Sequence, residues 1–341
     1  MMEAAFPLLG TVFVILFVLP CCALLAKAVL IVLERDQSIG PLRALNLRYV
    51  LLTGSSALPL AWFLSAGLHQ AETWKSGLPC LLDHDAAALC FEPGYFTLAL
   101  SLAVIGLSVR AVRRQPRAEA ALPSDAAAAL ALRLDGIIAR HASLSELHRR
   151  VVVCDEEGYT LGTHGLRKPR VFVGIAFASR LSDDMLASAL GHEREHVRAL
   201  DPLRYLLLRV ALAVNPFGAM LLDRHVARWH AAREAHCDRQ AVVEGAAPLS
   251  LADAIVRAAR PHCREVVALG APDTAVLKLR VGLLLAFAEK TPVRCCHEGL
   301  AAFPVGFVLL FIALLLPHQA GTGALDALHS GAEHALTYFW R

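Results

Sequence analysis

Long apolar runs alternate with polar segments along the chain. Four of these runs contain no charged residue and cover 23, 20, 17 and 19 residues: Ala4–Ala26, Tyr49–Leu68, Pro93–Val109 and Gly299–Pro317. A helix needs about 20 mostly apolar residues to cross a bilayer, so the pattern predicts four transmembrane helices. A cleaved signal peptide is the alternative for the first run, but that run is long and no basic segment precedes it.

The composition agrees with membrane spans. Hydrophobic residues make up 56% of the 341 residues, charged residues make up 18%, and the mean hydropathy is +0.51. Soluble domains usually carry about a quarter charged residues. The net charge of +3 is too small to argue for a nucleic-acid partner, so the lipid bilayer is the expected environment.

The distribution of basic residues predicts the orientation of the chain. Four of them separate the first two runs and four follow the third: Lys27, Arg35, Arg43, Arg48, Arg110, Arg113, Arg114 and Arg117. The loop 69–92 has one lysine and four acidic residues instead. By the positive-inside rule, both termini and this loop lie outside, whereas the segment 110–298 is cytoplasmic.

The expected organisation has four parts: a membrane region over 1–111 with three spans, a cytoplasmic domain over 112–298, a fourth span over 299–317 and a short outside tail over 318–341. Cys80 and Cys90 both fall in the outside loop. An oxidising compartment favours a disulfide between them, with two free thiols as the alternative.

Short strands are predicted early in the cytoplasmic segment. An alanine-rich stretch at about 124–148 favours a helix, and the β-branched stretches Val151–Cys154 and Arg170–Gly174 favour strands. Glycine-rich turns separate these strands. The residues Arg170, Val171, Phe172 and Val173 form either an edge strand that holds an extended substrate or a plain core strand.

A capped helix follows the strands and carries the most informative motif. Ser182 is a good N-cap for a helix over 183–200. The helix contains the sequence His192-Glu193-Arg194-Glu195-His196. Residues four apart lie on one helical face, so both imidazoles can reach one zinc ion, and Glu193 can take a proton from a water beside it. The alternative is a solvated helix face that binds no metal.

A zinc site of this kind needs a third protein ligand. Glu234 is the best candidate, and Asp238, four residues later, can accept a hydrogen bond from a ligating histidine. His230, His236 and Asp238 are competing ligands. The group that stabilises an oxyanion is left open among four residues: His225, His230, His236 and Arg239.

The segment between these motifs predicts a helical hairpin. If Leu206–Leu222 crossed the membrane, Glu234 would lie on the opposite side from His192 and His196. One metal site cannot be built across a bilayer. We therefore expect the segment 203–222 to turn near Asn215-Pro216-Phe217-Gly218 and to dip into the membrane or lie beside it.

These motifs together resemble a known family. The HEREH sequence, Asp201, Asn215-Pro216 and Glu234–Asp238 resemble metallopeptidase family 56, the BlaR/MecR-type membrane peptidases. The stretches Gly165–Val173 and Leu277–Arg280 resemble it as well, and HtpX-type membrane peptidases are similar less closely. The resemblance implies a gluzincin-like domain in a bacterial plasma membrane. It further implies one zinc ion per chain, held here by His192, His196 and Glu234. Glu193 would be the catalytic base, and Asp238 and Asp201 would be outer partners of the ligands.

The expected function is hydrolysis of a peptide bond on the cytoplasmic side. The resemblance suggests a BlaI-like transcriptional repressor as the substrate. The family's antibiotic sensors carry a large outside domain after the last span, and the 24 residues from His318 cannot form one. The alternatives are an HtpX-like quality-control protease and a latent signalling or scaffold protein with the same zinc site.

Overall fold

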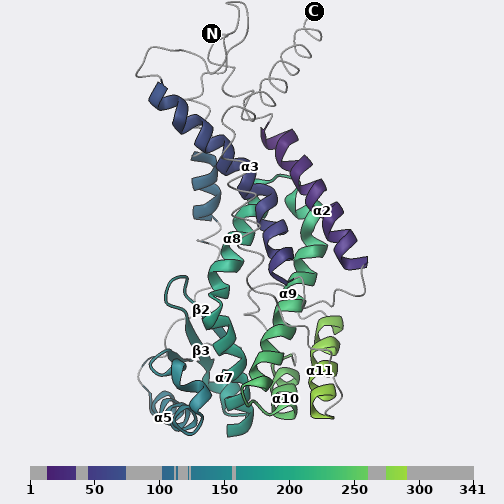
Figure 1. The fold of residues 1–341 in the computed structure, drawn as a ribbon. Coiled ribbons are helices and arrows are strands. Elements are labelled where there is room, and N and C mark those ends of the chain that lie inside the picture. The colour runs from purple at the N-terminus through teal and green to yellow at the C-terminus, as the bar shows by residue number, and fades with distance from the viewer. Residues whose placement is uncertain are drawn as a thin grey trace, which may run out of the picture.

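The computed structural model describes residues 14–35, 45–73, 102–110, 113, 122, 124–155, 159–259 and 274–289. Over this part of the chain the fold is mainly helical and contains one small sheet, as predicted, but the sheet has three strands where the sequence predicted two. Figure 1 shows long helices packed together at one end of the molecule, and the sheet with the remaining helices at the other.

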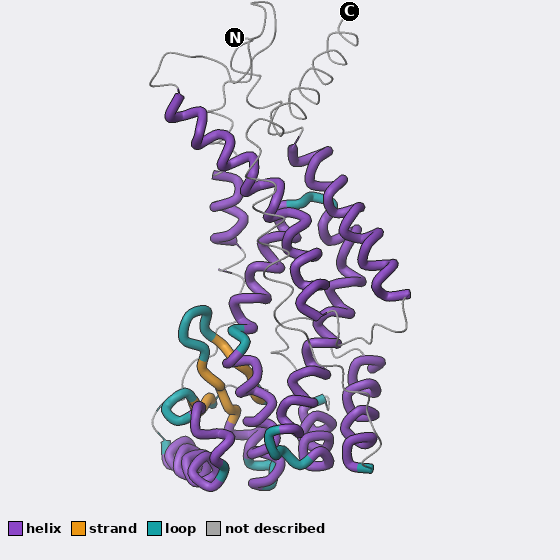
Figure 2. The backbone as a smooth tube through the Cα atoms, viewed as in Figure 1, coloured by secondary structure: helices purple, strands orange, loops and turns teal. Residues whose placement is uncertain are grey.

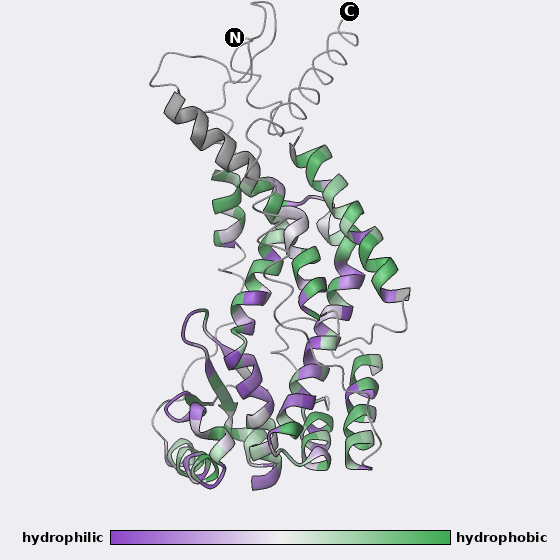
Figure 3. Cartoon of the chain, in the orientation of Figure 1, coloured by the Kyte–Doolittle hydropathy of each residue, from purple (hydrophilic) through white to green (hydrophobic). Residues whose placement is uncertain are grey.

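Helix α2 (Leu19–Arg35) continues the π-helical turn η2 (Val14–Val18). Together they contain Ile15–Glu34, the one helical segment of the described residues that is long and apolar enough to cross a membrane. Its mean hydropathy is 2.7, and only 22% of the window is buried, so an apolar surface is exposed along it (Figure 3). The first predicted run, Ala4–Ala26, is described from residue 14 onward, and the helix extends beyond its end to Arg35.

The other predicted spans are described in part. Helix α3 (Leu45–Thr73) covers the second run, Tyr49–Leu68, and packs against α2. Helical residues 102–110 cover the end of the third run. The fourth run, the tail 318–341 and the pair Cys80 and Cys90 lie outside the described residues, so the four-span layout stays a prediction.

The sheet has the strand order β1-β3-β2 (Figure 2). Its strands are β1 (Val151–Cys154), β2 (Leu161–His164) and β3 (Arg170–Gly174). Strand β3 pairs in parallel with β1 and antiparallel with β2, so it is the central strand. The edge-strand interpretation of the residues Arg170, Val171, Phe172 and Val173 is therefore wrong, because both sides of β3 are already hydrogen-bonded. Val171 and Val173 are fully buried, as a core strand requires.

Two capped helices enclose this sheet. Ser124 caps α5 (Asp125–Arg140) by accepting a hydrogen bond from Ala127 N, and a 3₁₀ turn, η4 (Ala142–Leu147), follows. Ser182 caps α7 (Asp183–Arg198) in the same way, through Met185 N. Leucines and isoleucines of these helices form the core with the valines of β3, and the short helix α6 (Ile175–Ala178) closes it.

Helices α8 (Asp201–Val214) and α9 (Gly218–Val243) form the predicted hairpin. Asn215 fixes the turn, since its amide donates to Leu19 O at 3.0 Å and its side-chain oxygen accepts from Phe217 N at 3.1 Å. The 26 residues of α9 span about 39 Å, which is long enough to reach from α2 and α3 to the sheet region. Helix α11 (Thr274–Ala288) packs against α9, and α10 (Pro248–Ala258) packs against α11 and α7.

Candidate metal centre

Two histidines of α7 face each other in a buried position. His192 and His196 are one helical turn apart, and their Nε2 atoms lie 3.1 Å from each other. Both side chains are buried, as is Glu193. The polar atoms of His192, Glu193 and His196 form a group that could hold a metal ion.

Glu234 completes this group from helix α9. Its Oε2 lies 3.4 Å from His192 Nε2, and its Oε1 lies 3.5 Å from His196 Nε2. A tetrahedral zinc ion with bonds of about 2.0–2.1 Å has ligand atoms about 3.3 Å apart. The donor set of two imidazoles and one carboxylate therefore fits zinc in both chemistry and spacing. Glu234 remains 27% exposed, so the group is open on one side.

The other ring nitrogen of each histidine contacts a buried aspartate. His192 Nδ1 lies 2.8 Å from Asp238 Oδ1, and His196 Nδ1 lies 2.6 Å from Asp201 Oδ2. A carboxylate at Nδ1 holds the proton there and leaves Nε2 free to bind a cation. Asp201, a predicted outer partner, forms this hydrogen bond with His196. Asp238 lies beside His192 as predicted, but as an ion-pair partner, because the geometry does not form a hydrogen bond at Nδ1.

An arginine holds each of these aspartates in turn. Arg280 of α11 donates to both oxygens of Asp238, with Nε 2.7 Å from Oδ2 and Nη2 2.8 Å from Oδ1. Its Nη1 also lies 2.9 Å from Glu234 Oε2. Arg233 of α9 donates to Asp201 Oδ2 at 2.7 Å. Sequence reasoning assigned no role to either arginine.

The charges of this cluster shift the pKa values of its members. Burial alone would lower the pKa of His192, but Asp238 and Glu234 outweigh it and raise the pKa to about 9. Burial would raise the pKa of Glu234, whereas Arg280 and His196 hold the pKa of this carboxyl well below its usual range. Glu234 is therefore ionised at neutral pH, and a cation at the Nε2 atoms must compete with a proton on His192.

Glu193 is held by a residue of the sheet. Thr163 on β2 donates a hydrogen bond of 2.6 Å to Glu193 Oε2 and lies 3.3 Å from the carbonyl oxygen of Glu193. Among the described strands, β2 pairs with β3 alone and is an edge of the sheet. Sequence reasoning missed Thr163, because it lies in a stretch between glycines that predicted a turn.

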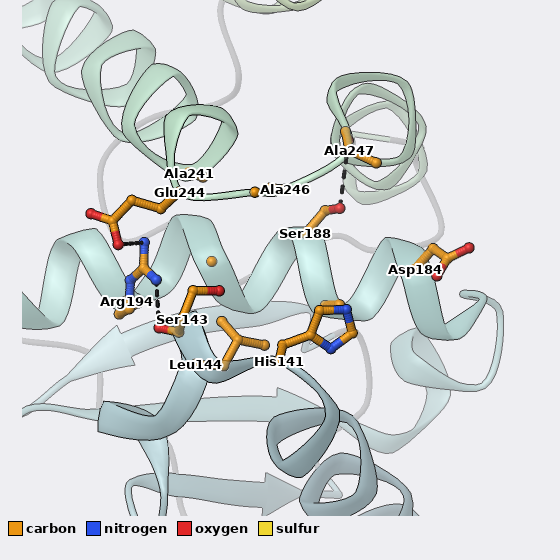
Figure 4. Close-up of a pocket in the computed structure, with 13 residues that line it drawn as sticks. His141, Ser143, Leu144, Asp184, Ser188, Arg194, Ala241, Glu244, Ala246 and Ala247 are labelled. Atoms are coloured by element: carbon orange, nitrogen blue, oxygen red, sulfur yellow. Dashed lines mark hydrogen bonds and ion pairs between the residues drawn. The ribbon is translucent and has the colours of Figure 1, made fainter.

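The middle residues of the motif serve a different purpose. Arg194 and Glu195 are buried, and Arg194 pairs with Glu195, Glu244 and the carbonyl oxygen of Ser143. Arg194, Glu244 and Ser143 line a cavity of about 320 Å³ beside α7 (Figure 4). His192, His196 and Glu234 do not line this cavity, so it is separate from the metal group. The contacts of Arg194 anchor α7 to its neighbours.

The four candidates for the oxyanion-stabilising group lie in different environments. His225 pairs with Glu34 of α2 at 2.9 Å. It precedes Glu234 by nine residues, or about 13.5 Å along the helix, which is too far to stabilise an oxyanion formed at the metal group. The His230 ring packs on the rings of Tyr205 and Trp229, with centroids 4.8 and 5.0 Å away. Within the part of the chain that the structure describes, neither His236 nor Arg239 hydrogen-bonds to a candidate ligand.

Cys237 belongs to an outer layer of the same group. Its Sγ lies 3.7 Å from His196 Nδ1, and the polar atoms of His196, Asp201 and Cys237 are close enough to hold an ion. His196 Nδ1 is already paired with Asp201, however. The arrangement therefore supports the orientation of His196 and does not require a second metal.

Comparison of the chain with protein-family models, with curated proteins and with solved structures finds no match in any of the three. The functional assignment therefore depends on the chemistry and geometry of the residues themselves. The most informative part is the triangle formed by the Nε2 atoms of His192 and His196 and the carboxylate of Glu234.

Proposed function

We propose that the chain is a membrane-embedded zinc metalloendopeptidase with its active site on the cytoplasmic side. One observation carries the proposal: the Nε2 atoms of His192 and His196 and the carboxylate of Glu234 lie 3.1 to 3.5 Å apart, with Glu193 beside them. Three protein ligands and an open side are typical of catalytic zinc sites, whereas structural sites are closed by four.

The residues around this triangle can perform peptide hydrolysis. A zinc ion held there supplies a polarised water and a Lewis acid for the scissile carbonyl. Glu193 accepts a proton from the attacking water and delivers it to the leaving nitrogen. Thr163 keeps the Glu193 carboxylate in place through its hydrogen bond of 2.6 Å. Asp238 and Asp201 keep the two imidazole rings oriented.

Strand β2 replaces β3 as the strand that we propose holds the substrate. Within the described residues, β2 has one neighbour in the sheet, so its other side can pair with an extended peptide. Thr163 connects this strand to Glu193. A peptide added to β2 therefore runs close to the proposed base.

The membrane location rests on helix α2 and on the charge pattern. Ile15–Glu34 has the length and apolar surface of a membrane span. The basic clusters between the first two predicted spans and after the third favour a cytoplasmic position for residues 110–298 by the positive-inside rule. We propose four spans in a bacterial plasma membrane and a cytoplasmic protein as the substrate, with a BlaI-like repressor as the substrate that the family resemblance suggests.

The test compares purified wild type with Glu193→Gln in detergent. Metal content is measured together with cleavage of casein and of a co-expressed BlaI-like repressor. Asp184→Asn is the matched control, because it removes an exposed carboxylate from the same helix. We expect about one zinc per chain in all three proteins, with cleavage by wild type and the control alone. If Glu193→Gln cleaves as fast as wild type, the proposed mechanism is wrong.

If wild type and Glu193→Gln both bind zinc and neither cleaves any substrate, the site is latent or serves signalling. Cleavage of casein would support the broad specificity of a quality-control protease. Cleavage of the repressor alone would support a regulatory peptidase.

A further inference from the structure

Arg280 is the described residue that joins the metal group to helix α11. Its guanidinium makes two hydrogen bonds to Asp238, at 2.7 and 2.8 Å, and an ion pair of 2.9 Å to Glu234. The side chain is only 15% exposed. Three of its nitrogens thus contact the two carboxylates that define one side of the group.

The two carboxylates would be unfavourable neighbours without this arginine. Glu234 and Asp238 are four residues apart on α9, so they share one helical face and repel each other. The planar guanidinium presents its donors in a fixed fork and can hold both carboxylates at once. Asp238 in turn contacts His192 Nδ1 at 2.8 Å, so the effect of Arg280 reaches a histidine as well.

Arg233 provides an internal comparison. It holds Asp201, the aspartate beside His196, and donates to the carbonyl oxygen of Glu195 at 3.1 Å. Each candidate histidine ligand therefore contacts an aspartate, and that aspartate is held by an arginine. Of these two arginines, Arg280 is the one that also pairs with the carboxylate of a candidate ligand, Glu234.

We infer that Arg280 is a positioning residue of the metal centre, which sets the orientation of Glu234 directly and that of His192 through Asp238. The inference rests on the cation-binding part of the proposed function and does not require peptidase activity. Two effects of the arginine oppose each other. Its positive charge repels a cation and weakens binding, whereas its hydrogen bonds fix the ligands and strengthen binding. The sign of the change after substitution therefore tells which effect dominates.

The experiment measures zinc affinity by competition with a chromophoric chelator for Arg280→Gln and Arg280→Lys in detergent. Lys278→Gln is the matched control, because it removes the same charge from an exposed position of the same helix. We expect both Arg280 variants to bind zinc about 10–100-fold more weakly than wild type, the usual effect of removing an outer partner. Lysine does not restore binding, because a single ammonium cannot reproduce the fork. Lys278→Gln keeps the wild-type affinity.

Circular dichroism of the metal-free proteins controls for folding. Should Arg280→Gln fail to fold, Arg280→Lys decides alone, because it retains the buried positive charge. Wild-type affinity in Arg280→Lys, or tighter binding by Arg280→Gln, would overturn the inference and leave Arg280 as a counter-charge. Zinc affinity does not depend on cleavage. A wild-type protein that binds zinc without cleaving therefore contradicts the proposed function and leaves the test of Arg280 intact.

Discussion

Thr163 donates a hydrogen bond of 2.6 Å from its hydroxyl to Oε2 of Glu193. The bond joins strand β2 to helix α7 at the residue that we propose as the catalytic base. It also restricts Glu193 to one orientation beside His192 and His196, with which it forms the buried group. The sheet therefore contributes to the site even though every candidate ligand lies on a helix.

Substitution of Thr163 by valine removes this donor and keeps the shape of the side chain. A hydrogen bond to a charged group contributes about 1.5–3 kcal/mol, so we expect kcat to fall by about 10- to 100-fold. Zinc content should not change, because Thr163 contacts no candidate ligand of the triangle. Thr163→Ser keeps the hydroxyl and should retain most of the activity. Equal kcat for Thr163→Val and wild type would show that this bond does not matter for catalysis.

Asp201 is predicted to be important for both stability and metal binding. Its side chain is 1% exposed and contacts His196 Nδ1 and Arg233 Nε. Asp201→Asn leaves the buried Arg233 without its counter-charge, and such a loss costs about 3–5 kcal/mol. We expect a lower free energy of unfolding and zinc binding weakened by about 10–100-fold.

Asp253→Asn is the control for this change. Asp253 pairs with Arg257 on the surface, where an ion pair contributes at most about 1 kcal/mol. Equilibrium unfolding and chelator competition should therefore show little difference between this variant and wild type. Similar effects of the two substitutions would mean that the buried Asp201 has no special role.

Zinc affinity should depend on pH through His192. Its pKa in the folded, metal-free protein is raised from 6.5 to about 9, so the imidazolium is favoured between these values. The pairing of the imidazolium with Asp238 and Glu234 stabilises the metal-free fold fully below pH 6.5, and this contribution is lost as the pH rises through 9. A cation needs the neutral ring, so affinity rises with pH over the same interval, by up to about tenfold per pH unit.

The measurement is titration calorimetry at pH 7.5 in two buffers with different heats of ionisation. We expect at least one proton to be released for each zinc bound, because the pKa of His196 is raised above its usual value as well. The apparent affinity should level off above about pH 9. Zinc binding without proton release at pH 7.5 would contradict the protonated state that we assign to His192.

Local spacing explains which parts of the site could be predicted from sequence. His192 and His196, and likewise Glu234 and Asp238, are four residues apart on single helices, so their shared faces follow from helix geometry alone. The turn at Asn215 could also be predicted, because the two histidines and Glu234 must lie on the same side of a membrane to form one metal site. The cap at Ser182 and the start of α7 could be predicted as well, because an N-cap depends only on neighbouring residues.

Long-range packing explains what could not be predicted. No spacing rule connects Thr163 with Glu193, or Arg280 with Glu234, because these pairs meet only when separate elements pack together. The central place of β3 was missed since its second neighbour, β2, contains Gly162 and lacks the β-branched pattern of a strand. The helix also ends at Arg198 and not at residue 200, because Leu200 adopts a left-handed conformation with φ of 54° before α8 begins.

The central claim is that His192, His196 and Glu234 bind one zinc ion together. X-ray absorption at the zinc edge of the purified protein, loaded with one equivalent of zinc, tests this claim most directly. We expect two imidazole nitrogens and carboxylate oxygen at about 2.0–2.2 Å, with no sulfur at about 2.3 Å. A protein that retains no zinc, or a shell that contains sulfur from a cysteine such as Cys237, would contradict it.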